Sequence, residues 1–223
     1  MIKLLVLATT NKNKVKEFRE ILSDFNIEIR SLSDFGPIPE AIEDGDTFDD
    51  NAYKKAIHTA KVLGLPAIAD DSGLEVDVLN GAPGVFSARY AGKNSTDQEN
   101  CTKLLAEMKG KTNRKANFTC VISIAVPSGP ALTYEGKCYG TITEERHGDN
   151  GFGYDPVFLH KTLNKTFAEL GSEEKHSVSH RGMALSQIKD EADKILKWLD
   201  QRLFEEKPEK PDHSEFEGND WSV

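Results

Sequence analysis

The chain of 223 residues has little cysteine, no long apolar run and a deficit of positive charge. Its cysteines, Cys101, Cys120 and Cys138, are too few and too scattered for a disulfide framework or a structural zinc site, so we expect a reducing, cytoplasmic compartment. Residues 1–8 form too short an apolar stretch for an export signal, and no stretch approaches the roughly 20 apolar residues of a membrane-spanning helix.

The charge balance narrows the possible partners. Lys and Arg number 28 and Asp and Glu 37, which gives a net charge of −9. Such a chain is poorly suited to bind the backbone of a nucleic acid or an anionic membrane. A small phosphate ligand remains compatible with this balance, because its site needs only local positive charge.

The order of the apolar patterns predicts an α/β fold with a mixed sheet. Residues 2–8 and 27–30 are expected to form strands, separated by a helix whose apolar residues recur every three or four positions. Thr47 is expected to cap a helix that ends at Gly64, and a short strand over 67–69 follows. A hairpin of strands 117–126 and 131–136 comes next, and one long helix ends near residue 203.

Composition changes after residue 204. Residues 205–223 hold seven acidic and two basic residues, and they show almost no apolar periodicity. We therefore expect one globular domain over residues 1–204 and a disordered acidic tail over residues 205–223.

Polar residues at the end of the first strand form a candidate anion site. The segment Thr9-Thr10-Asn11-Lys12-Asn13-Lys14 lies where a helix begins, and the free N–H groups of a first turn attract anions. The segment is not a Walker A loop, which needs GxxxxGK[ST]. A capped helix with surface lysines explains the same residues.

Two acidic segments offer oxygen ligands for a metal ion. The loop that begins at Glu43 precedes a helix on which Asn51 and Lys55 share a face, and Asp70 and Asp71 follow a short strand. Mg²⁺ prefers such hard oxygen ligands. Adjacent residues of a strand point to opposite faces, so the two aspartates are expected to have different roles. A solvated loop and a polar turn are the simpler alternatives.

The remaining candidates lie near the C-terminal half of the domain. Phe152 stands between two glycines, and its flat ring could face a base or pin the loop to the core. Lys175 and Arg181 add positive charge, whereas His180 taken alone is more often structural. Together the five segments describe a site for a nucleotide polyphosphate.

The sequence also resembles the Ham1 family of inosine/xanthosine triphosphate pyrophosphatases. Six motifs carry the resemblance, in family order: Thr9-x-Asn11-x-x-Lys14, Glu43-x-Gly45-x-Thr47-Phe48-x-x-Asn51-Ala52, Ala69-Asp70-Asp71-Ser72-Gly73-Leu74, Gly81-Ala82-Pro83-Gly84-x-x-Ser87-Ala88-Arg89-Tyr90, Phe152-Gly153-Tyr154-Asp155-Pro156 and Ser179-His180-Arg181-Gly182. The resemblance implies an elongated mixed sheet flanked by helices, with two lobes around a central nucleotide-binding cleft.

The resemblance further implies a Mg²⁺-dependent homodimer that hydrolyses ITP, dITP and XTP to the monophosphate and pyrophosphate. Asp71 would be the proton acceptor and, with Glu43, a metal ligand, and Lys55 would act beside it on the site helix. Residues 9–14 would hold the phosphates. The other substrate-binding positions would be Ser72, Phe152, Gly153, Tyr154, Asp155, Lys175, His180 and Arg181.

Two other functions remain open at this point. A Maf-like nucleotide pyrophosphatase would have a related architecture but a different base preference. A nucleotide-binding regulator would bind ITP without turning it over, although it would have no need of the set Glu43, Lys55 and Asp71. The DxDx[TV] motif of haloacid-dehalogenase-type phosphatases is absent from the sequence.

Overall fold

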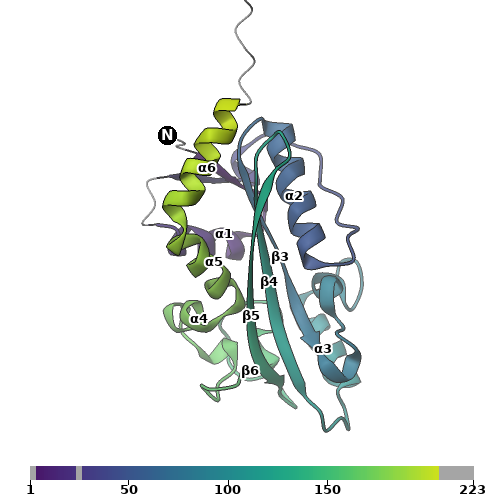
Figure 1. Cartoon of the computed structure of the whole chain (residues 1–223). Helices are drawn as coiled ribbons and strands as arrows, with labels where there is room; N and C mark the ends of the chain where they lie inside the picture. Colours follow the sequence, from purple (N-terminus) through teal and green to yellow (C-terminus); the bar gives the residue numbers. More distant parts are fainter. Residues whose placement is uncertain (1–3, 24–26, 206–223) are drawn as a thin grey trace, which may run out of the picture.

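A computed structural model of the chain describes residues 4–23 and 27–205 (Figure 1). Its centre is a six-stranded mixed sheet in the order β2-β1-β3-β4-β5-β6. The pairs β2-β1 and β1-β3 are parallel, and the pairs β3-β4, β4-β5 and β5-β6 are antiparallel. The strands are β1 (Leu4–Leu7), β2 (Glu28–Ser31), β3 (Ala67–Val76), β4 (Lys115–Ala125), β5 (Ala131–Ile142) and β6 (Phe158–His160). The expected α/β class with a mixed sheet is confirmed.

Helices cover both faces of this sheet. They are α1 (Lys12–Ile21), α2 (Phe48–Leu63), α3 (Asp97–Glu107), α4 (Ser172–Val178), α5 (His180–Asp190) and α6 (Ala192–Glu205). Alternate residues of each strand meet different helices: Leu5 and Leu7 pack with α1, α5 and α6, whereas Val6 packs with the alanines of α2. None of the helices within the described ranges has the length and apolar character needed to cross a membrane.

The long strands β3, β4 and β5 run through two lobes (Figure 1). One lobe carries α1, α2 and α6 around the parallel strands. The other is built around a second apolar cluster that includes Leu74, Leu104, Phe158 and Phe167, and it contains α3, α4 and β6. The predicted elongated, two-lobed architecture is therefore confirmed.

Local signals placed the ends of α2 correctly. Thr47 Oγ1 accepts a hydrogen bond from Asp50 N at 3.1 Å, which satisfies a free N–H group of the first turn. Gly64 closes the helix in the left-handed region, at φ +63°. These short-range contacts depend only on neighbouring residues, so sequence alone predicts them.

Three predicted elements differ from the structure. The strand expected over 67–69 continues to Val76, because the polar residues 70–73 pair with the antiparallel strand β4. The strand expected over 131–136 continues to Ile142 for the same reason. The single long C-terminal helix is interrupted at Glu191, so α5 and α6 are separate. Of the expected tail, residues 206–223 lie outside the described residues, and Glu205 ends α6.

Candidate active site

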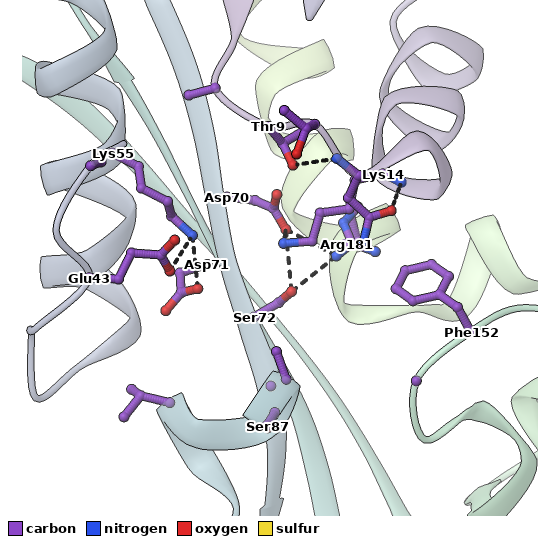
Figure 2. A pocket seen from close by; sticks show the side chains of 18 of the residues that line it. Thr9, Lys14, Glu43, Lys55, Asp70, Asp71, Ser72, Ser87, Phe152 and Arg181 are labelled. Atoms are coloured by element: carbon purple, nitrogen blue, oxygen red, sulfur yellow. Dashed lines mark hydrogen bonds and ion pairs between the residues drawn. The ribbon is translucent and has the colours of Figure 1, made fainter. Parts of the chain in front are cut away.

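A cavity of about 640 Å³ opens between the two lobes, beside the end of β1 and the polar middle of β3. This volume lies within the range of pockets that bind nucleotide-sized ligands. Most of the predicted site residues line it: Thr9, Thr10, Asn11, Lys14, Glu43, Lys55, Asp71, Ser72, Phe152, Gly153, Tyr154, Asp155, Lys175, His180 and Arg181. The structure therefore collects segments that lie up to 172 positions apart in the chain (Figure 2).

On one side of β3, two carboxylates converge on a lysine of α2. Lys55 Nζ lies 3.0 Å from Asp71 Oδ1 and 3.2 Å from Glu43 Oε2 (Figure 2). Burial raises the pKa of Asp71, although the charge of Lys55 opposes the shift. Burial alone would lower the pKa of Lys55, but the nearby carboxylates outweigh it and raise that pKa. Asp71 therefore holds a proton more readily than an ordinary aspartate.

On the other side of β3, Asp70 pairs with two cations from distant helices. Its Oδ2 atom lies 3.0 Å from Lys14 Nζ and 3.0 Å from Arg181 Nη2. Ser72 Oγ also accepts a hydrogen bond from Arg181 at 3.0 Å. Burial would raise the pKa of Asp70, but Lys14 and Arg181 hold it far below the usual range. Asp70 is thus a fixed negative charge that organises cations at the cavity wall.

The predicted anion loop is only partly turned toward the cavity. Asn11 caps α1, and its side chain accepts hydrogen bonds from Asn13 N at 2.9 Å and Lys14 N at 3.3 Å. Lys12 and Asn13 are exposed and do not line the cavity, because they occupy the outer side of the first turn. Thr9, Thr10, Asn11 and Lys14 are the members of this segment that face it.

The loop around Phe152 is anchored by a buried ion pair. Lys175 Nζ lies 2.6 Å from Asp155 Oδ2, and the same oxygen accepts a hydrogen bond from Phe152 N at 2.9 Å. The Lys175 ammonium lies 4.8 Å from the centroid of the Phe152 ring. Tyr154 is buried and donates its hydroxyl to Ser87 O at 2.8 Å, so it fixes the loop to the core. Burial raises the pKa of Asp155 against the opposing charge of Lys175.

His180 is a neutral residue in an aromatic stack. Its ring lies parallel to Phe118, with centroids 4.6 Å apart and planes 9° apart. Burial, together with Arg181 and Lys175, lowers the pKa of His180 well below 6.5. His180 Nδ1 is buried and has no hydrogen-bond partner among the described residues.

Two residues that shape the site had no role assigned from the sequence, although Ser87 belongs to one of the motifs. Glu17 on α1 pairs with Arg181 and lies 3.5 Å from Lys175 Nζ. Its spacing of three positions from Lys14 places both on one helix face, and this signal was available. Ser87 Oγ accepts a hydrogen bond from Leu74 N at 2.9 Å and donates to Gly84 O at 2.6 Å. The contact with Gly84 is local, but no residue near Ser87 predicts its contact with Leu74, 13 positions away.

The carboxylates that face Lys55 fit a magnesium ion. Within residues 4–23 and 27–205, no group of three or more His, Cys, Asp or Glu side chains could hold a metal ion. Mg²⁺ commonly uses one or two carboxylates and completes its shell with phosphate oxygens and water. Glu43 and Asp71, which line the cavity and both pair with Lys55, provide that kind of donor set.

Cations and carboxylates that line a cavity beside the end of β1 place the chain among α/β proteins that bind phosphorylated ligands. Comparison with known proteins identifies the family. The chain belongs to the Ham1 family, whose model matches residues 5–191. The resemblance noted from the motifs is confirmed.

Similar proteins support both the fold and the family. A dITP/XTP pyrophosphatase of Desulfotalea psychrophila is 72% identical over 222 residues, which covers 100% of each chain. One of Syntrophobacter fumaroxidans is 58% identical and covers 91% of this chain and 88% of its own. The solved Ham1 protein of Coxiella burnetii has a TM-score of 0.81 at 44% identity, covering 86% of this chain and 100% of its own.

Proposed function

We propose that the chain hydrolyses dITP, ITP and XTP to the nucleoside monophosphate and pyrophosphate. The observation that carries the proposal is the convergence of Glu43 and Asp71 on Lys55 at the wall of a nucleotide-sized cavity. The names of the relatives, dITP/XTP pyrophosphatase, support the choice of substrates. The chain is accordingly a nucleoside triphosphate pyrophosphatase.

The cations of the cavity are arranged to hold a triphosphate. Lys14 and the preceding residues Thr9, Thr10 and Asn11 face the cavity, and Lys55 lies on the other side of β3. Positive charge on both sides binds the phosphates and stabilises the charge that develops as pyrophosphate leaves. Asp70 keeps Lys14 in place from the side of β3 opposite Asp71.

Asp71 is the residue best suited to activate water. Its raised pKa makes it a better proton acceptor than an ordinary carboxylate, and Lys55 fixes its Oδ1 atom. Water loses a proton to Asp71 as its oxygen bonds to the α-phosphorus, and the bond to the bridging α–β oxygen breaks. Mg²⁺, held by Glu43 and Asp71, would neutralise phosphate charge and lower the pKa of bound water.

The part of the cavity that we assign to the purine base has an aromatic ring and hydrogen-bond donors. Phe152 offers an aromatic face, and Lys175 and Arg181 lie 4.8 Å and 5.7 Å from its ring centroid. Hypoxanthine and xanthine carry a carbonyl at C6, which accepts hydrogen bonds, where adenine carries an amino group. A site built to donate to that carbonyl rejects adenine strongly, because a buried donor would otherwise lose its partner.

The first experiment is a turnover panel with Mg²⁺. ITP, dITP, XTP, GTP, ATP and dTTP are compared, and pyrophosphate and orthophosphate are quantified separately. We expect pyrophosphate from ITP, dITP and XTP and little from GTP or ATP. Equal activity on all bases, or a preference for other bases, would favour a Maf-like pyrophosphatase. Binding of ITP without turnover would indicate a regulator.

We propose further that the enzyme is a Mg²⁺-dependent homodimer of the cytoplasm. Phe86 and Tyr139 are 57% and 61% exposed, and a second copy of the chain is a natural cover for such large aromatic side chains. The three cysteines are free and buried, which suits a reducing compartment. The molar mass from light scattering, measured as the protein elutes from a size-exclusion column, tests the dimer. A monomeric mass at the concentration of the turnover assay would contradict it.

A further inference from the structure

Helix α3 carries none of the residues that the motifs suggested for chemistry, yet it holds the loop that bears Phe152. Asp97 Oδ2 accepts a hydrogen bond from Gly153 N at 2.7 Å, and Cys101 Sγ donates to Gly153 O at 3.3 Å. Arg146, at the start of the same loop, donates at 2.6 Å to Gln98 O and to Thr102 Oγ1. Both backbone polar groups of Gly153 are therefore bound to α3.

These contacts fix the residue next to the aromatic ring. Gly153 adopts φ +63°, a conformation that glycine enters without strain, so its peptide group can turn toward α3. On the other side, Phe152 N is bound to Asp155 Oδ2. Phe152 thus lies between two anchored peptide groups, one held by Asp155 and Lys175 and the other by α3.

The carboxylate of Asp97 is not needed to cap its helix. Thr96 and Glu99 already form a capping box, in which Thr96 Oγ1 accepts from Glu99 N and Glu99 Oε2 accepts from Thr96 N. Asp97 also lines the cavity, 56 positions from the loop that it binds. A first-turn acid can stabilise a helix through its charge alone, and the test below separates that role from hydrogen bonding.

We infer that Asp97 is a positioning residue for recognition of the purine base. It holds the Gly153 peptide and thereby sets where the Phe152 ring meets the base, beside Lys175 and Arg181. The inference rests on the proposed function. Loss of one charge-assisted hydrogen bond is expected to raise KM for ITP about fivefold to tenfold. The value of kcat changes less than twofold, because the base is bound equally in the ground and transition states.

Hydrogen exchange in the nucleotide-free protein tests the geometry directly. We expect Asp97→Ala to accelerate amide exchange in the peptide that contains Gly153. Asp97→Asn keeps a carbonyl acceptor but loses the charge, so it should retain the wild-type protection. Asp193→Ala, which removes an exposed first-turn acid of α6, is the matched control. The inference is overturned if Asp97→Asn accelerates exchange at Gly153 as much as Asp97→Ala does. It is also overturned if exchange at Gly153 is unchanged in Asp97→Ala.

Steady-state kinetics then test the consequence for the base. In a Phe152→Ala background, Asp97→Ala should add no further rise in KM, because the ring that it positions is gone. Additive effects of the two changes would overturn the inference. If the wild type releases pyrophosphate from ITP and Asp97→Ala has unchanged kinetics, this inference fails and the proposed function stands. If the wild type releases none, the proposed function fails, and with it the role of Asp97 in base recognition, whatever the exchange data show.

Discussion

Asp70 and Asp71 are adjacent on β3, but their carboxylates lie on opposite sides of the strand. Asp70 Oδ2 is 3.0 Å from Lys14 Nζ, and Asp71 Oδ1 is 3.0 Å from Lys55 Nζ (Figure 2). Alternation along the strand therefore links α1 and α2 through two consecutive residues. The pKa of Asp70 is lowered and that of Asp71 is raised, so matched substitutions should have different consequences.

Asp71→Asn should remove turnover and preserve the fold. The amide keeps the size of the carboxylate but cannot accept a proton from water, so kcat for ITP is expected to fall about 100-fold or more. Pyrophosphate release measures the loss, and thermal unfolding checks that the variant is folded. Turnover close to that of the wild type would rule out Asp71 as the base.

Asp70→Asn should lower the free energy of unfolding. Asp70 is 3% exposed, and the change leaves Lys14 without its buried counter-charge and Arg181 with Glu17 as its remaining carboxylate partner. Removing one partner of a buried ion pair costs about 3 kcal/mol or more. Urea denaturation measures the loss. Asp77→Asn, at an exposed aspartate that follows the same strand, is the control and should change stability by less than about 0.5 kcal/mol.

Glu43→Gln should weaken the binding of Mg²⁺ and leave the protein folded. We expect chelation with EDTA to stop wild-type turnover and Mg²⁺ to restore it, and we expect Glu43→Gln to need about tenfold more Mg²⁺ or higher. Asp44→Asn is the matched control, because Asp44 is exposed and pairs with Lys54 at 2.6 Å. Turnover of both variants is measured over a range of Mg²⁺ concentrations, which shows whether Glu43 or Asp44 is the metal ligand. An effect confined to Asp44→Asn would move the ligand to that residue.

Local patterns predicted a good part of the site. The cap of α2 at Thr47 and the different roles of Asp70 and Asp71 both follow from residues close in the chain. Such features depend on helix ends and strand alternation, which act over a few residues.

What the sequence did not predict depends on distant pairing. The polar residues after 69 read as a turn, and they form a strand because β4, some 50 residues later, supplies their hydrogen-bond partners. Glu17 and Asp97 likewise gain their contacts from residues 164 and 56 positions away. Propensity and spacing carry no information on these encounters, since only the assembled sheet brings the partners together.

His180 should make the stability of the enzyme depend on pH. Its ring is buried against Phe118, and burial, with Arg181 and Lys175, holds its pKa well below the value of 6.5 expected for the unfolded chain. The unfolded state therefore binds the proton first as the pH falls. The stability from a neutral His180 is fully present well above pH 6.5 and is lost as the pH falls through 6.5, at a rate that approaches about 1.4 kcal/mol for each pH unit at lower pH.

His180→Phe isolates this contribution, because phenylalanine keeps an aromatic ring beside Phe118 but cannot be protonated. Urea denaturation at pH 7.5, 6.5 and 5.5 measures the free energy of unfolding of both proteins. Only the change between pH values is compared, so a constant packing difference cancels. We expect the wild type to lose about 1 kcal/mol more than the variant between pH 6.5 and 5.5, because half of the unfolded chains already carry the proton at pH 6.5. Equal losses would mean that His180 takes up a proton in the folded state, and its ring would then be a donor at both nitrogens.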